Sequence, residues 1–150
     1  MKKLLIATAL VAWVGSAMAQ DAMKVVKADD VKWVEHPVFK GAQTAILIGD
    51  PSKKEIVVQR VKFPPNSKVG PHTHPYAEIV TVISGSFGNG MGDKFDPAKG
   101  DILKAGFVFA LPAKHAHYVW TTNEEVIVQI YFTGPGGIDF INPADDPRKK

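Results

Sequence analysis

Short apolar, β-branched runs alternate along this chain with turn-forming residues, at intervals of roughly eight to twelve residues. After the N-terminal leader, no window of about eleven residues repeats its apolar positions with the 3.6-residue period of a helix. The pattern therefore predicts an all-β domain, a sandwich or a closed barrel. The predicted strands are residues 31–34, 44–49, 55–63, 78–84, 102–103, 107–111, 115–121, 126–132 and 138–141.

Two interruptions of the strand pattern shape this prediction. Pro64 and Pro65 end the strand before them, because proline cannot donate a hydrogen bond to a sheet. The glycine-rich segment 88–93 could be interpreted as a phosphate-binding loop, but no Gly-Lys-Ser/Thr ending and no helical pattern follow it. We therefore expect a bent strand and a hairpin there. The chain shows no internal repeat, linker or low-complexity segment, which favours one domain.

The first nineteen residues resemble a secretory signal peptide. Lys2 and Lys3 form a basic start, residues 4–14 are apolar, and residues 17–19 read Ala-Met-Ala, a cleavage signal before Gln20. The apolar run is shorter than the roughly 20 residues that cross a membrane. The sequence thus predicts a cleaved leader over residues 1–19, a single domain over residues 20–150 without a membrane span, and a location in the periplasm or outside the cell.

Charge and cysteine content narrow the function classes. The leader holds two of the eighteen basic residues and none of the fifteen acidic ones, so the remaining chain has a net charge of about +1. No Lys/Arg cluster alternates with aromatic residues, so we expect no nucleic-acid partner. The chain has no cysteine. Its stability therefore depends on the core and on any bound metal, and a metal site would consist of His, carboxylate and water.

Residues 70–85 hold the strongest candidate chemistry. His72 and His74 are two residues apart and would point to the same side of an extended strand. Glu78 keeps the same parity, and His117 begins a later strand after a turn at Pro112. Three imidazoles and one carboxylate would bind a divalent transition metal and leave a coordination position open. Mn, Fe, Ni, Cu and Zn all suit this donor set.

These residues also give the chain a resemblance to the cupin superfamily, and in particular to small exported single-domain bacterial cupins of the type 2 group. The resemblance covers about residues 55–133. The first cupin motif is His-x-His, three or four residues, Glu, six residues and Gly, matched by His72, His74, Glu78 and Gly85. The second is Gly, five residues, Pro, x, Gly, two residues and His, matched at Gly106, Pro112 and His117.

The resemblance implies a jelly-roll β-barrel with the metal inside it, held by three His and one Glu. The core motifs would lie at residues 70–85 and 106–117. Three positions depart from the usual motif. Asn66 and Lys114 replace glycines, so Lys114 must avoid a positive φ or hold it with strain. Thr121 stands where the second motif often has Asn.

Other side chains are candidates for the walls of the cavity. On the strand 126–132, the alternate face carries Gln129 and Tyr131, which could line the cavity or be partly exposed. Phe109 and Trp120 are expected in the core or the pocket wall, and Tyr76 at the cavity mouth. The candidate proton-transfer groups are Tyr131, His115 and Tyr76, with His115 placed either in the cavity or on the outside of its turn. His36 is expected at a surface strand end.

The sequence leaves three functions open. The first is a metal-dependent enzyme acting on a small molecule, such as a dioxygenase, an isomerase or a hydrolytic enzyme. The second is a non-catalytic protein that binds a metal or a small ligand outside the cytoplasm. The third is a structural domain whose metal only stabilises the fold. Exposed N-terminal strands could pair between subunits, so a homodimer is a further expectation.

Overall fold

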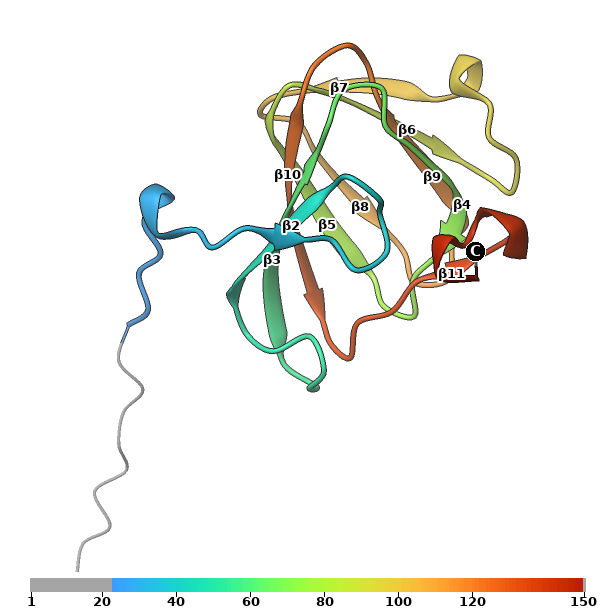
Figure 1. Cartoon of the computed structure of the whole chain (residues 1–150). Helices are drawn as coiled ribbons and strands as arrows, with labels where there is room; N and C mark the ends of the chain where they lie inside the picture. The colour runs from blue at the N-terminus through green and yellow to red at the C-terminus, as the bar shows by residue number, and fades with distance from the viewer. Residues whose placement is uncertain (1–22, 150) are drawn as a thin grey trace, which may run out of the picture.

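The computed structural model describes residues 23–149, which form eleven β-strands and four short 3-10 helices (Figure 1). The leader predicted over residues 1–19 lies outside the described residues. The helices are η1 (Ala28–Asp30), η2 (Pro97–Lys99), η3 (Pro143–Asp145) and η4 (Pro147–Lys149). None of the helices in the described part of the chain is long and apolar enough to cross a membrane.

The strands form two antiparallel sheets that face each other (Figure 1). The six-stranded sheet has the order β1 (Val34–Glu35), β2 (Gln43–Ile48), β3 (Ile56–Phe63), β10 (Val126–Thr133), β5 (Glu78–Ser84) and β8 (Val108–Leu111). The five-stranded sheet has the order β11 (Asp139–Phe140), β4 (Lys68–Thr73), β9 (His117–Thr121), β6 (Ser86–Met91) and β7 (Asp101–Lys104). The predicted all-β class is confirmed.

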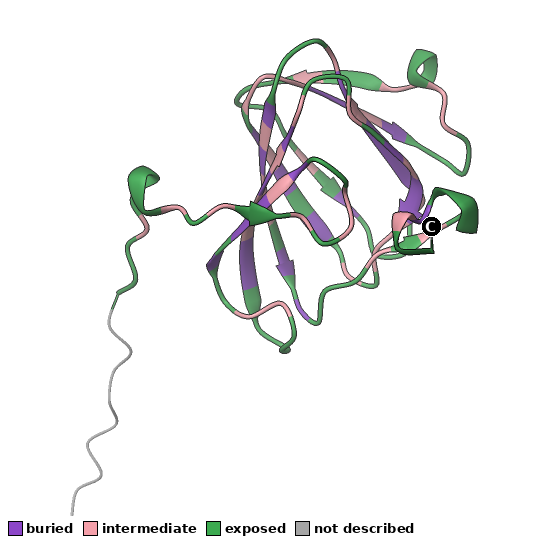
Figure 2. Cartoon of the chain, viewed as in Figure 1, coloured by how far each residue is buried: buried purple, intermediate pink, exposed green. Residues whose placement is uncertain are grey.

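The core lies between the two sheets, where the longer strands bury side chains from their inner faces (Figure 2). Val61, Val80 and Val128 come from the six-stranded sheet, and Phe87 and Val119 from the five-stranded one. Side chains of this kind bury apolar area from both inner faces, the main favourable contribution to folding such a sandwich. This core holds the two sheets in the register that brings the histidines together.

The N-terminal segment covers part of the outer face of the six-stranded sheet. In place of the predicted strand 31–34, the structure has the two-residue strand β1 (Val34–Glu35). Apolar residues before β1 pack against β2 and β3. The Nζ of Lys62 lies 4.4 Å from the ring centroid of Trp33, a cation–π contact. The apolar residues of this second cluster are Val26, Val31, Trp33, Ala45, Leu47 and Val58.

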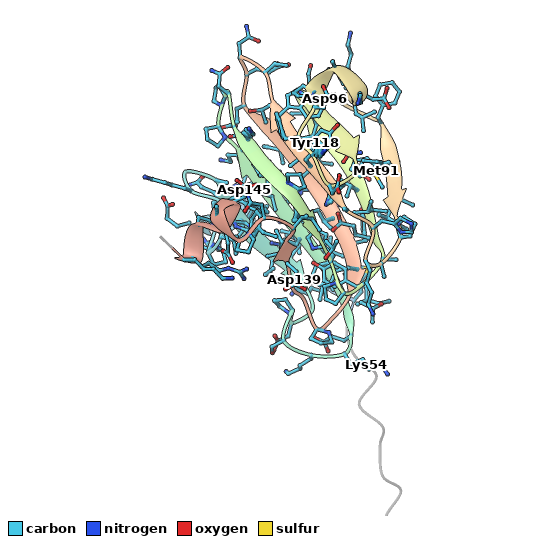
Figure 3. All side chains as sticks on the ribbon, turned by 90° about the vertical axis from the view of Figure 1, so that its right-hand side faces the viewer. Lys54, Met91, Asp96, Tyr118, Asp139 and Asp145 are labelled. Atoms are coloured by element: carbon cyan, nitrogen blue, oxygen red, sulfur yellow. The ribbon has the colours of Figure 1, made fainter. Side chains whose placement is uncertain are left out.

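The glycine-rich segment forms strand β6, which pairs with both β7 and β9. A Cβ atom at Gly88 would lie 2.1 Å from the Trp120 ring, so glycine lets that ring lie flat on the backbone. The Tyr118 hydroxyl donates to the carbonyl oxygen of Asp96 at 2.7 Å (Figure 3). The expected strand and hairpin are therefore present, since β6 pairs antiparallel with the next strand, β7, and β6 is packed under aromatic rings.

Two of the positions that depart from the motif hold positive φ angles. Asn66 has φ of 57° and Lys114 has φ of 62°. Asparagine tolerates this region, but lysine does not favour it. The amide of Lys114 donates to the carbonyl oxygen of His74 at 2.8 Å, so the strained turn is tied to the histidine loop. Of the two alternatives for Lys114, the chain holds the positive φ.

Candidate metal centre

The pairing of β4 with β9 brings three histidines to one point. A register shift between Val69 and His72 places His72 directly opposite His117. His74 follows at the end of β4, and its ring meets that of His72 edge-on at 5.0 Å between centroids. One ring nitrogen from each of the three histidines lies within 4.8 Å of the others. This spacing is compatible with a single metal ion bound between them.

Each of the three rings has its Nδ1 atom held by an oxygen. His72 Nδ1 donates to the Gly70 carbonyl at 2.8 Å, and His74 Nδ1 to the Gly137 carbonyl at 2.8 Å. His117 Nδ1 donates to Oδ1 of Asn89 at 3.2 Å. A carbonyl oxygen only accepts, so the proton of each ring sits on Nδ1 and the Nε2 lone pair is free. This is the arrangement of a metal-ligating histidine.

Burial keeps the imidazoles of His72 and His117 neutral. The pKa of His72 is lowered to about 4, mainly by desolvation, with the Gly70 hydrogen bond opposing the shift and the nearby His74 adding to it. Desolvation also lowers the pKa of His117 to about 2, with His72 and His74 adding to the effect. The Nε2 atom of His117 is buried without a hydrogen-bond partner among residues 23–149. A buried polar atom of this kind is costly unless something binds it, and a metal ion fits this donor.

Glu78 lies beside this group at the start of β5. Its carboxyl is only 4 % exposed, and its Oε1 is 3.9 Å from His74 Nε2. Burial raises the pKa of Glu78, and His74 opposes that shift. Glu78 is not within the 4.8 Å group that the three histidines form. The described residues therefore give three imidazoles around one point with a buried carboxyl next to them.

The histidines open into a cavity of about 580 Å³ between the two sheets. A cavity of this size is typical of a small-molecule site. Most of the side chains in its wall are apolar or aromatic. The aromatic side chains of the wall are Phe39, Phe63, Tyr76, Phe87, Phe109 and Phe132.

Two of the predicted wall residues do line the cavity, Phe109 and Tyr76. The Tyr76 ring stacks on Phe132 at 4.3 Å and on His74 at 5.3 Å between centroids. Its hydroxyl lies 3.3 Å from His74 Nδ1. Burial raises the pKa of Tyr76 and the charge of Glu78 adds to this, so the phenol stays protonated. Tyr76 is therefore able to donate a hydrogen bond but is a poor base.

Of the two placements left open for Gln129 and Tyr131, the structure shows the one outside the cavity. The cavity wall takes the apolar face of β10, Val128, Ile130 and Phe132, so the polar face turns outward. Gln129 accepts from Nε of Arg60 at 2.9 Å and donates to the Tyr131 hydroxyl. The polarity of a strand face does not identify the cavity wall here, because that wall is mainly apolar.

Trp120 and His115 also lie outside the cavity. On β9 the residues that face the cavity are His117 and Val119, so Trp120 points to the opposite face, where it packs on Gly88 and Phe95. The assignment of Trp120 to the substrate pocket is therefore wrong. His115 is exposed, which agrees with the outward of its two predicted placements and removes it from the candidates for proton transfer at this site.

Sequence reasoning missed two residues of the site. Asn89, which orients His117, lies in the glycine-rich segment and carries no motif signal. His36 is half-buried and lines the cavity, so its expected place at the surface is wrong. In the sequence, His36 stands at the end of a strand and before a proline, and this pattern does not distinguish the surface from a cavity wall.

The comparisons with known proteins agree with this geometry. The cupin family model matches residues 51–142, so the chain belongs to the cupin family. The two facing sheets are its jelly-roll barrel, as predicted. No curated protein shows significant sequence similarity to the chain.

Several solved structures share the fold. The polyketide cyclase RemF from Streptomyces resistomycificus has a TM-score of 0.70 at 22 % identity, covering 85 % of this chain and 92 % of RemF. A predicted oxalate decarboxylase from Thermotoga maritima has a TM-score of 0.59 at 22 % identity, covering 73 % and 97 %. KdgF from Halomonas sp. has a TM-score of 0.57 at 18 % identity, covering 76 % and 94 %. At these identities the likeness establishes the fold alone.

Proposed function

We propose that this protein is an exported cupin that binds one divalent transition metal through His72, His74, His117 and Glu78 and acts on a small molecule in the adjoining cavity. The observation that carries the proposal is the set of three imidazoles, each with Nδ1 bonded to an oxygen and Nε2 free, beside a cavity of about 580 Å³. Such an ion, when bound, polarises a carbonyl, activates water or, if redox-active, supports dioxygen chemistry.

The chain's own residues would do the rest of the work. The Nδ1 hydrogen bonds hold the three rings in place, and the aromatic wall excludes water from the reacting molecule. Tyr76 keeps its proton and could donate a hydrogen bond to a substrate oxygen. The solved relatives include a polyketide cyclase and a predicted oxalate decarboxylase, which supports small-molecule chemistry for this fold without choosing the reaction.

The alternative is a non-catalytic protein that binds a metal or small ligand outside the cytoplasm. One observation favours it: His115, Tyr131 and Gln129 lie outside the cavity, so fewer groups there can move a proton. Turnover of a panel of small phenols, diketones and sugar acids by the metal-loaded protein would separate the two functions. Binding of a panel member without turnover of any would support the binding protein.

The metal is tested on protein purified from its native compartment, with elemental analysis to identify the ion. We expect one ion per chain, sharply reduced by His117→Ala and more moderately by Glu78→Gln, which keeps the shape of the side chain. His115→Ala, at an exposed histidine outside the cavity, is the matched control. Sub-stoichiometric metal under metal-replete conditions would refute the proposal, and a Glu78→Gln variant with wild-type affinity would remove Glu78 from the ligand set.

Export and assembly belong to the same proposal. The leader pattern in residues 1–19 supports a periplasmic or secreted location, and mass spectrometry of the native protein should find Gln20 at its N-terminus. Apolar side chains on the outer face of the six-stranded sheet, among them Ile79 and Val108, are exposed and support a homodimer. Analytical ultracentrifugation of the mature protein tests this, and a monomer at high micromolar concentration would contradict it.

A further inference from the structure

A fourth histidine belongs to the cavity, and the family match does not include it. His36 follows β1, and its backbone amide donates to the Ala42 carbonyl at 2.9 Å. Its side chain is half-buried and lines the same cavity as the three clustered histidines. The matched family region begins only at residue 51, so His36 is a feature of this chain's own N-terminal segment.

The proton of His36 sits on the opposite nitrogen from that of the metal-centre histidines. His36 Nδ1 accepts hydrogen bonds from the backbone amides of Val38, at 3.1 Å, and Phe39, at 2.9 Å. An imidazole nitrogen that accepts cannot carry a proton, so the neutral ring is protonated on Nε2. Of the four histidines in the cavity wall, three therefore have an Nε2 lone pair and one, His36, has an Nε2–H donor.

The neutral, fixed state of this ring has two causes. Burial lowers the pKa of His36 to about 4, so the ring is neutral at pH 7. The ring also stacks on Phe39, with centroids 4.2 Å apart and planes 9° apart. Phe39 in turn lies 6.2 Å from the His72 ring, with the two planes tilted by 57°, so the Phe39 ring lies between His36 and the metal centre. Such a ring presents its donor in one orientation at little cost in side-chain entropy on binding.

Gln59 and Arg148, two other donors of the cavity wall, already have acceptors. Gln59 donates from Nε2 to the Thr44 hydroxyl at 2.7 Å. The guanidinium of Arg148 is paired with Asp146 and also donates to the Ile138 carbonyl. The hydrogen bonds of the His36 ring within residues 23–149 are those at Nδ1, and Nε2 has no acceptor there. The imidazole thus offers a free N–H in a cavity whose wall is mainly apolar and aromatic.

We propose that His36 is a substrate-binding residue whose Nε2–H donates to one oxygen of the bound molecule while a second oxygen of that molecule binds at the three-histidine centre. The substrate class is then an aromatic or enolic compound with at least two oxygens, since the aromatic wall fits a flat apolar body. This inference rests on the proposed function, because it requires a metal-bound small molecule. It adds a specificity residue outside the cupin motifs and a class of ligand.

The first test compares two probes on zinc-loaded protein: 4-nitrocatechol, which has two adjacent ring oxygens, and 4-nitrophenol, which has one. The nitro group is common to both, so its own contacts cancel in the comparison. The variant is His36→Asn, because an Asn side-chain oxygen can still accept from the amides two and three residues ahead. It keeps the loop and removes the Nε2–H. His115→Asn is the matched control at an exposed histidine.

We expect His36→Asn to weaken 4-nitrocatechol binding about threefold to tenfold, the loss of one neutral hydrogen bond, and to change 4-nitrophenol binding less than twofold. Zinc affinity should be unchanged. Equal loss for both probes, or no loss for either, would overturn the role of His36 and leave the proposed function intact. Failure of zinc-loaded wild type to bind 4-nitrocatechol, or binding that does not need zinc, would overturn both.

The second test does not depend on the variant folding. In ¹⁵N-labelled, zinc-loaded wild-type protein, NMR distinguishes the two histidine tautomers directly. We expect His36 as the Nε2–H tautomer, the three metal-centre histidines as Nδ1–H tautomers, and a shift of the His36 Nε2 resonance when 4-nitrocatechol is added. A proton on His36 Nδ1, or an Nε2 resonance that does not respond to the probe, would refute the inference.

Discussion

The Oδ1 atom of Asn89 lies 3.2 Å from the Nδ1 atom of His117, and this contact links β6 to the metal centre. The other two metal-centre histidines donate to main-chain carbonyls, those of Gly70 and Gly137. Among the three acceptors, Asn89 is therefore the one that a substitution can remove. Its contact gives the glycine-rich strand β6 a role at the site, that of orienting a metal ligand.

Asn89→Ala should weaken metal binding about tenfold to a hundredfold without removing a ligand, because His117 would lose the partner that fixes its tautomer and ring orientation. Asn89→Asp should retain most of the affinity, since a carboxylate also accepts from Nδ1. Competition with a chromogenic chelator measures both. Asn123→Ala, at an exposed asparagine, is the control. Wild-type affinity in Asn89→Ala would show that His117 needs no such support.

Acid should destabilise the metal-free protein. Burial holds the pKa of His72 near 4 and that of His117 near 2, both below the usual 6.5. Below pH 6.5 the unfolded chain takes up these protons while the folded chain does not, so stability falls as pH falls. Each histidine should lower the free energy of unfolding by about 2 kcal/mol between pH 7.5 and pH 5. The raised pKa of Glu78 acts in the opposite direction and offsets part of this loss.

Urea denaturation of the chelated protein at pH 7.5 and pH 5 measures this loss. A His72→Asn variant should lose less stability over the same interval, because one of the groups that resist protonation is gone. His115→Asn should behave as wild type, since that ring is exposed. Equal stability of the metal-free wild type at the two pH values would contradict the burial that the structure gives these imidazoles.

The local pattern places most of the strands and the three histidines, although β4 (Lys68–Thr73) is not among the predicted strand ranges. β5 has the predicted bounds of Glu78–Ser84, and β10 extends its predicted range by one residue. His72, His74 and His117 come together as expected because two come from one strand and β4 pairs with β9. Alternation and turn residues are local signals, and they fix strand positions and side-chain parity.

The placements that stayed open or were wrong depend on which face of a strand meets the cavity. Parity separates Gln129 and Tyr131 from their neighbours on β10 but does not say which set faces inward. Side-chain polarity is a poor guide to that choice, because the cavity is apolar and takes the other set. His36 and Asn89 are hidden for a related reason. Their roles come from contacts with residues distant in the chain or with a loop conformation, and neither leaves a pattern in the sequence.

Lys114→Gly should stabilise the protein. Lys114 holds a φ of 62°, which costs a residue with a Cβ about 1–2 kcal/mol, and glycine removes that cost. Glycine's greater freedom in the unfolded chain offsets part of the gain, so we expect a net increase of about 0.5–1 kcal/mol in the free energy of unfolding. Thermal denaturation measures it. Lys114→Ala keeps the Cβ and should show no such gain, and an equal gain in both variants would assign the effect to the lysine side chain instead.

Gly88→Ala should destabilise the protein by about 1–3 kcal/mol, the usual cost of forcing extra volume into a packed site. The added Cβ would lie 2.1 Å from the Trp120 ring. That ring also packs against Tyr118 and Phe95, which hold it in place. Gly136→Ala is the matched control, because its Cβ would meet its nearest neighbours at an ordinary 3.5 Å. A Trp120→Ala, Gly88→Ala double variant should show less than the sum of the two losses, since the clash disappears with the ring. Additive losses would mean that the ring does not restrict residue 88, and close packing under Trp120 would then not explain the glycine at that position.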